Sequence, residues 1–218
     1  MSDIRIELVQ CGNCAEYCQQ TVVCSVSMFG APDLDSRPGD LARYASTAWL
    51  NYCSDCFFCA EDIREAPKDP ALLSSERYQA IARDERYPEQ ARAFMLHALT
   101  VVDVEAMAFD YLVAAWVCDD EELVGLAREC RLVAAKHLNA LKPFNRGKKR
   151  IALGAVYVDV LRRTEQFALA QRECEGLLAS KHCAGEMREQ LEFQMRLIGV
   201  SDSGCHCVDE VGEYGERA

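Results

Sequence analysis

The chain has 218 residues, half of them hydrophobic, and a formal net charge of −11. This surplus of carboxylates argues against non-specific binding to nucleic acid and to anionic membrane surfaces, both of which recruit Lys and Arg. No apolar run approaches the roughly 20 residues that span a bilayer. The amino terminus lacks a charged segment followed by an apolar one, so it does not resemble a secretory signal. We therefore expect a cytoplasmic protein.

Thirteen cysteines are many for a chain of this size. In a cytoplasmic chain, paired cysteines at CxxC spacing indicate a metal site rather than disulfides. The cysteines in apolar helical segments further along are expected to be small buried hydrophobes. Seven of the thirteen fall before residue 60: Cys11, Cys14, Cys18, Cys24, Cys53, Cys56 and Cys59.

Residues 1–68 are rich in cysteine, turns and β-branched residues. The alternation of apolar and polar residues over 21–29 predicts a half-buried strand. The segment 30–40 contains two prolines and two glycines and predicts a turn-rich loop. The segment 42–52 is compatible with a strand or a short helix. Two prolines in 64–74 predict a boundary there, between this part and the next.

From residue 71 to residue 200 the pattern predicts one helix after another. Apolar residues recur at helical spacing over 91–99, 104–111, 123–138, 153–161, 167–178 and 187–198. The segments 126–135 and 170–179 resemble each other, which indicates a repeated helix pair of 40 to 45 residues, as in tetratricopeptide-like arrays. An ordinary helical bundle is the alternative. The remaining residues, 201–218, are acidic and rich in glycine, and we expect them to be disordered.

The two CxxC pairs, Cys11 with Cys14 and Cys53 with Cys56, predict a zinc ribbon. Structural zinc takes four ligands in a tetrahedron, and thiolates suit it. The 38 residues between the pairs exceed the compact spacing of many such sites, so the insert must form strands and a loop of its own. In this interpretation the other cysteines before residue 60 are not ligands.

An iron–sulfur cluster is the alternative. Residues 8–20 and 49–63 resemble the paired cysteine runs of ferredoxin-like subunits, such as the small subunit of heterodisulfide reductases. Leu8 and Ile63 replace one cysteine of each run, and both losses fall on the same cluster. The other cluster, a [4Fe–4S] centre, would keep the ligands Cys18, Cys53, Cys56 and Cys59, and the protein would then transfer electrons.

Residues 27–63 resemble the DUF2225-like group, a bacterial family of uncharacterised proteins. The segment "FGAPDLDSRP" at 29–38 matches its Phe-Gly-x-Pro-Asp-Leu-Asp-x-Arg-Pro run, and Trp49 with the second cysteine pair matches the knuckle that follows. The resemblance implies a zinc ribbon joined to tetratricopeptide-like helices, with no established activity. Gly12 and Ser54 stand where the group has the proline of each knuckle, and Phe57 replaces the glycine of the second.

Asp33, Asp35 and Arg37 lie in the loop between the knuckles and are the other candidate polar site. We favour a loop that fixes its own shape, because Asp accepts backbone N–H bonds in turns and Arg pairs with Asp. No phosphate-binding loop, nucleophile elbow or paired-histidine metal motif is recognisable, so no catalytic residue is assigned.

The sequence thus predicts an α+β protein that is mainly α, with a zinc ribbon followed by an all-α, repeat-like domain. Zinc would supply the folding free energy that a small, loop-rich part lacks. The helical domain would bind a protein or peptide partner.

Overall fold

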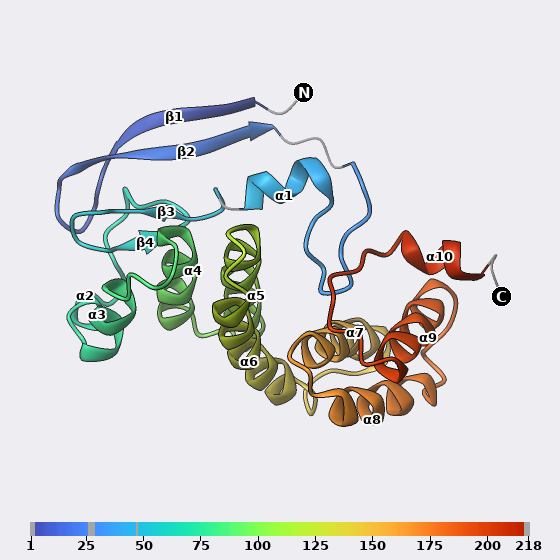
Figure 1. The fold of residues 1–218 in the computed structure, drawn as a ribbon. Coiled ribbons are helices and arrows are strands. Elements are labelled where there is room, and N and C mark those ends of the chain that lie inside the picture. Colours follow the sequence, from blue (N-terminus) through green and yellow to red (C-terminus); the bar gives the residue numbers. More distant parts are fainter. Residues whose placement is uncertain (1–2, 26–28, 47, 216–218) are drawn as a thin grey trace.

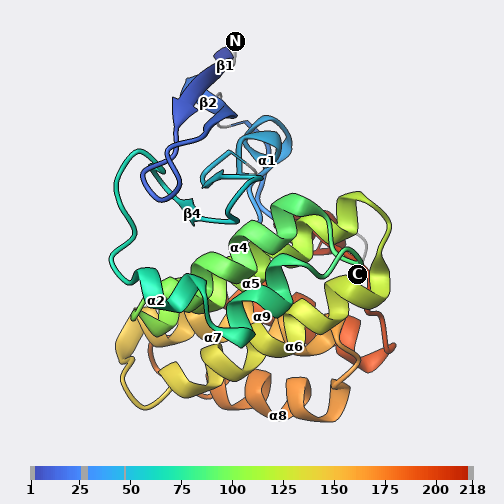
Figure 2. The ribbon, with the colours of Figure 1, turned by 90° about the vertical axis from the view of Figure 1, so that its left-hand side faces the viewer.

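The computed structural model describes residues 3–25, 29–46 and 48–215. The chain is mainly helical, with its strands confined to the amino-terminal part. Figures 1 and 2 show the strands and the short helix α1 together on one side of an array of helices. This arrangement confirms part of the predicted fold class: the chain is mainly helical, and its strands lie in the amino-terminal part.

Each cysteine pair lies in the turn of a β-hairpin. Strand β1 (Asp3–Gln10) pairs antiparallel with β2 (Tyr17–Ser25), and the turn between them carries the first pair. Strand β3 (Asn51–Tyr52) pairs with β4 (Cys59–Ala60) around the second pair. Both turns therefore comprise six residues, from 11 to 16 and from 53 to 58.

The strand predicted over 21–29 begins earlier in the structure, at Tyr17. The knuckle turn sets this start, because pairing resumes directly after it with Tyr17 opposite Gln10. Residues 26–28 lie outside the described part of the chain. The ambiguous segment 42–52 contains both expected elements, since α1 (Asp40–Ser46) is followed by β3.

The helical part begins with α2 (Pro70–Leu73), where proline occupies the first helical position and Asp69 accepts two backbone N–H bonds. It continues with α3 (Glu76–Ala82), α4 (Glu89–Thr100), α5 (Val104–Asp120), α6 (Val124–Leu141), α7 (Gly147–Arg163), α8 (Phe167–Leu178) and α9 (Glu186–Gly199). Helix α5 is buried almost all round between Asp110 and Cys118, so it forms the centre of the core.

Two helix pairs, α5 with α6 and α7 with α8, are joined by the same turn. Glu122 and Glu165 each adopt a left-handed backbone at φ 59° and 62°. In both turns the next residue donates its N–H to the carbonyl five residues earlier, at 2.8 and 2.9 Å. The two turn residues, Glu122 and Glu165, are 43 positions apart in the sequence. In the resemblance between segments 126–135 and 170–179, by contrast, matched residues such as Arg128 and Arg172 are 44 positions apart. The hairpins therefore share a turn without matching residue for residue.

The core crosses the boundary predicted near residue 70. Cys53, Phe58 and Ile63 of the second knuckle pack in one cluster with Tyr78 of α3 and Leu96 of α4. The amino-terminal part is therefore built onto the helices rather than tethered to them.

The carboxy-terminal segment, for which we expected disorder, contains a β-bridge and a short helix within residues 201–215. Asp33 forms an antiparallel bridge with Cys207, and helix α10 (Glu210–Gly215) follows. The buried Arg162 donates to the carbonyls of Asp202 and Gly204 at 2.7 and 2.8 Å. The polar composition suggested disorder, but these bonds act together with apolar packing, since Val208 and Val211 lie against the buried Leu34 and Phe193.

In the described part of the chain, no helix combines the length and the apolar character that a membrane span requires.

Candidate metal centre

The structure brings together the four cysteines that the spacing assigned to a metal. The thiol sulfurs of Cys11, Cys14, Cys53 and Cys56 all lie within 4.8 Å of one another. Sγ of Cys11 is 3.6 Å from Sγ of Cys56, and Sγ of Cys14 is 3.7 Å from Sγ of Cys53. Each close contact joins the two knuckles, so a single ion between them would hold both hairpins. Four thiols at this separation could bind a metal ion.

The two knuckles have the same backbone hydrogen bonds. The N–H of Ala15 donates to the carbonyl of Cys11, and the N–H of Phe57 donates to the carbonyl of Cys53, both at 2.8 Å. The first cysteine of each knuckle donates its own N–H across the turn at 2.9 Å. Ala15 and Phe57 take up a left-handed backbone, with φ of 65° and 62°. Glycine adopts this conformation most easily, so each turn holds a residue with a side chain in a conformation that favours glycine.

Gly12 is where the first knuckle comes closest to the rest of the chain. The N–H of Gly12 donates to the carbonyl of Ile63 at 2.7 Å, a bond that proline cannot make. A Cβ at this position would lie 2.6 Å from the backbone of Glu65. The first knuckle therefore rests directly on the chain that leaves the second.

We expect Gly12→Ala to destabilise the chain by about 1–3 kcal/mol, because the added methyl group must displace backbone atoms rather than a flexible side chain. The matched control is Gly176→Ala in α8, where a Cβ meets nothing within 4 Å and the helix gains about 0.5–1 kcal/mol. Urea denaturation of both variants measures the difference. Equal stability of Gly12→Ala and the wild type would contradict the close approach.

The thiols differ in how readily they lose a proton. Burial raises the pKa of Cys53 and of Cys56. Burial acts in the same direction on Cys11, but the N–H groups of Cys14 and Asn13 and the neighbouring thiols outweigh it and lower the pKa of Cys11. Metal binding must therefore release protons, and acid must compete with the metal for this site.

The other cysteines of the amino-terminal part bond elsewhere. Sγ of Cys18 lies 3.7 Å from the carbonyl of Val9 and accepts from Nε2 of Gln20 at 3.1 Å. Sγ of Cys59 lies 3.7 Å from the hydroxyl of Tyr78, and burial raises the pKa of Cys59 to about 12. Among the described residues, the one group of close metal-ligating side chains contains neither Cys18 nor Cys59.

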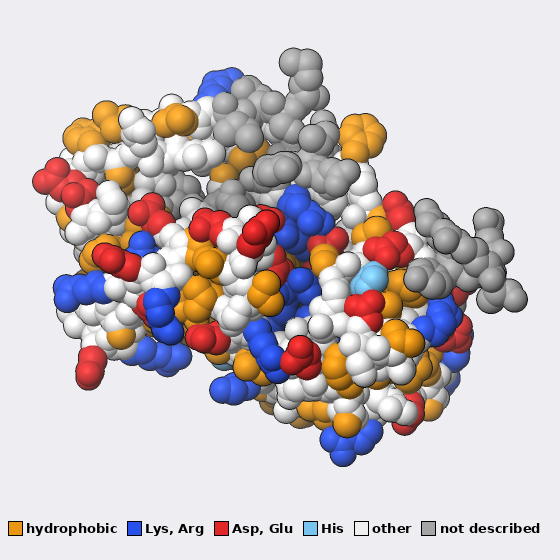
Figure 3. Space-filling view, viewed as in Figure 1, with side chains coloured by type: hydrophobic (Ala, Val, Ile, Leu, Met, Phe, Trp, Pro, Cys, Tyr) orange, Lys and Arg blue, Asp and Glu red, His pale blue; other side chains and the backbone are white. Residues whose placement is uncertain are grey.

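The second candidate site, the Asp33–Arg37 loop, lies against the ends of the long helices. Asp35 is fully buried, and its Oδ2 accepts from Nε1 of Trp116 at 2.9 Å and from Arg163 at 3.1 Å. Arg131 lies 3.5 Å away. Burial opposes the ionisation of Asp35, but these arginines outweigh it and lower its pKa. Basic side chains gather in the middle of the face shown in Figure 3, between the two halves of the helical array.

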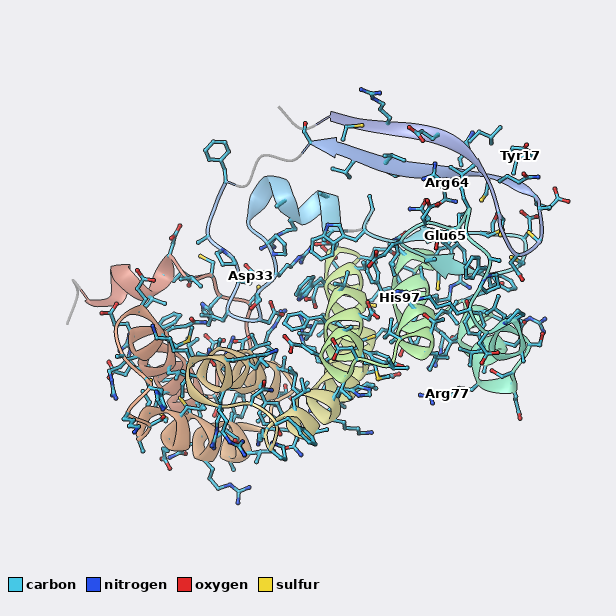
Figure 4. All side chains as sticks on the ribbon, turned by 180° about the vertical axis from the view of Figure 1, so that it is seen from behind. Tyr17, Asp33, Arg64, Glu65, Arg77 and His97 are labelled. Atoms are coloured by element: carbon cyan, nitrogen blue, oxygen red, sulfur yellow. The ribbon has the colours of Figure 1, made fainter. Side chains whose placement is uncertain are left out.

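The other two members of the loop also bond outside it. Asp33, labelled in Figure 4, accepts from Arg43 at 2.7 Å and from the thiol of Cys205 at 3.3 Å. Burial and the charge of Asp35 raise the pKa of Asp33. Arg37 pairs with Asp120 at the end of α5. Through these contacts the loop connects the amino-terminal part, the helices and the carboxy-terminal segment. We call Asp33, Asp35 and Arg37 with their partners the joint.

The His206 side chain of the tail is occupied by its own neighbours. Its ring nitrogens lie 2.7 Å from Glu210 and 3.1 Å from Asp202. Among the described residues, no group of close metal-ligating side chains includes Cys205, His206 or Cys207.

Comparisons with family models, with curated proteins and with solved structures find no match for this chain. The resemblance to the DUF2225-like group therefore stays a prediction.

Proposed function

We propose that this chain is a zinc protein whose ion is structural and whose helices bind a protein partner. The observation that carries the zinc assignment is the spacing of the sulfurs. A Zn–S bond of about 2.3 Å gives a tetrahedron with edges of about 3.8 Å. The contacts of 3.6 and 3.7 Å between the knuckles fit these edges.

The iron–sulfur alternative has less support. A four-iron cluster is larger than one ion, so its thiolate ligands stand farther apart than the sulfurs here. It would also need Cys18 and Cys59, which bond to other groups. Zinc has no redox chemistry, so we assign the ion the role of holding the two hairpins together.

The proposed role in protein binding rests on the helical hairpins. Helices α5 to α9 pack in chain order, each against the next, and two of the hairpin turns are alike. Stacked helix pairs offer an extended surface to a protein or peptide. The net charge of −11 disfavours nucleic acid and anionic membranes as partners. A cytoplasmic location and membership of the DUF2225-like group complete the proposal.

The test is metal analysis of protein purified without oxygen, together with its visible absorption spectrum. We expect one zinc per chain and a colourless protein, since Zn²⁺ has a filled d shell. A brown protein with about four irons and four sulfides per chain would overturn the zinc assignment.

A further inference from the structure

A cleft separates the second knuckle from the turn between α4 and α5. One wall is the chain from Phe58 to Asp62, which continues directly from the cysteine ligands. The linker Glu65–Asp69 and helix α2 close one side. The facing wall is the end of α4 with the turn that follows it, Thr100–Asp103. Figure 4 labels His97 and Glu65, which both line this cleft.

The inner surface of the cleft is largely apolar. Its apolar side chains come from the knuckle, α2 and the α4–α5 turn: Phe58, Ala60, Leu72, Leu73, Val101 and Val102. Val102 is 93% exposed, although it is a large aliphatic residue. Apolar surface in a concave site is the usual mark of a binding pocket.

The rim of the cleft is acidic. Five carboxylates line it, Glu61, Asp62, Glu65, Asp69 and Asp103, against the single cation Lys68. Asp62 is neutralised by Arg64, and Asp69 and Asp103 cap helices. The carboxylates of Glu61 and Glu65 are exposed and form neither a hydrogen bond nor an ion pair with another described residue. The negative charge of the rim is therefore available to a ligand.

A polar group also faces the apolar interior. Nδ1 of His97 lies 2.8 Å from Oδ2 of Asp110, which comes from α5 and is buried. When this nitrogen donates to Asp110, Nε2 carries a lone pair. Nε2 has no hydrogen-bond partner among the described residues, while His97 lines the cleft. It can therefore accept a hydrogen bond from an N–H group of a ligand.

We propose that the cleft binds a short segment of a partner protein in which apolar residues are followed by lysine or arginine. The apolar side chains fill the interior, the cations pair with Glu61 and Glu65, and Nε2 of His97 accepts from the bound segment. This proposal rests on the protein-binding part of the proposed function and gives it a location. Because the knuckle forms one wall, binding also depends on an intact metal centre.

The test is fluorescence anisotropy of the full chain with a labelled peptide, Gly-Ser-Leu-Leu-Lys-Arg-Gly-Ser. We expect a Kd of about 10–100 μM, since a short segment buries little surface. A twin with Glu in place of Lys and Arg should bind at least about tenfold more weakly, because like charges meet at the rim. A twin with Ser in place of both Leu should lose affinity to the same degree. Failure of the first peptide to bind, or equal binding of the acidic twin, would overturn the proposal.

The residues are tested with the double variant Glu61→Gln/Glu65→Gln, which changes only exposed side chains. We expect its affinity to fall about fivefold at low salt and less at high salt. The control, Glu186→Gln/Glu189→Gln on α9, removes the same charge away from the cleft and should bind like the wild type. If Glu61→Gln/Glu65→Gln binds the peptide as tightly as the wild type, these two carboxylates do not pair with the peptide's cations, and the proposal is refuted. Metal content is measured on the same samples. Protein without zinc would contradict the zinc assignment, whereas zinc-loaded protein that does not bind the peptide would contradict the proposed cleft.

Discussion

Cys11→Ser is expected to release the metal and unfold the two knuckles, whereas Cys59→Ser is expected to keep both. Structural zinc contributes about 10–16 kcal/mol to the folding of small zinc domains, and a serine hydroxyl is a poor substitute for a thiolate ligand. Sγ of Cys11 faces Sγ of Cys56, so its loss opens the contact between the knuckles. Cys59 lies outside the group of close sulfurs and packs beside Tyr78, so its replacement leaves the four ligands in place.

Zinc per chain and the far-UV circular dichroism spectrum of both variants measure this difference. Cys59→Ser serves as the matched control, because it makes the same chemical change in the same small core. If Cys59→Ser lost the metal and Cys11→Ser kept it, the ligand set of the iron–sulfur alternative would be correct.

The metal ligands could be found from the sequence because their signal is local. A CxxC pair places two sulfurs on one turn, and the second pair completes four ligands however long the insert is. The hairpins around the knuckles were only partly predictable. Alternation identified part of β2. The sequence of β1 alternates as well, with Ile4, Ile6 and Leu8 next to Arg5 and Glu7, so it also carries a strand signal. The strand is nevertheless exposed from Arg5 to Leu8, and the knuckle turn fixes how it pairs with β2.

The joint around Asp35 could not be predicted, because its partners are far away in the chain. The residues that hold its carboxylate, Trp116, Arg131 and Arg163, lie 81, 96 and 128 positions away. The sequence pattern predicts a loop that fixes its own shape. Three bonds within the loop agree with this: the N–H of Arg37 donates to the carboxylate of Asp35, the N–H of Asp33 to the carbonyl of Arg37, and the N–H of Ser36 to the carbonyl of Asp33. A buried acid and two buried arginines on separate helices leave no pattern that a single sequence reveals.

Asp35→Asn is expected to destabilise the chain by about 3–5 kcal/mol near neutral pH. Without the charge of Asp35, the two guanidinium groups of Arg131 and Arg163 would share the single carboxylate of Asp119, and one positive charge would be left without compensation. The matched control is Asp120→Asn, which removes the half-exposed partner of Arg37 at the same joint. We expect that control to cost less than Asp35→Asn, because Asp120 is half-exposed and water screens its charge, although Arg37 is buried. Urea denaturation of both variants measures the two values.

The dependence on pH separates a charge effect from a packing effect. Because the arginines lower the pKa of Asp35 in the folded chain, its ionised form contributes stability above its ordinary value of 3.8. That contribution is lost as the pH falls through the lowered value. The gap between wild type and Asp35→Asn should therefore stay constant from pH 8 to about pH 5 and narrow only in strong acid. A gap that is already closed at pH 5 would show that Asp35 is protonated in the fold, and that the arginines pair with Asp119 alone.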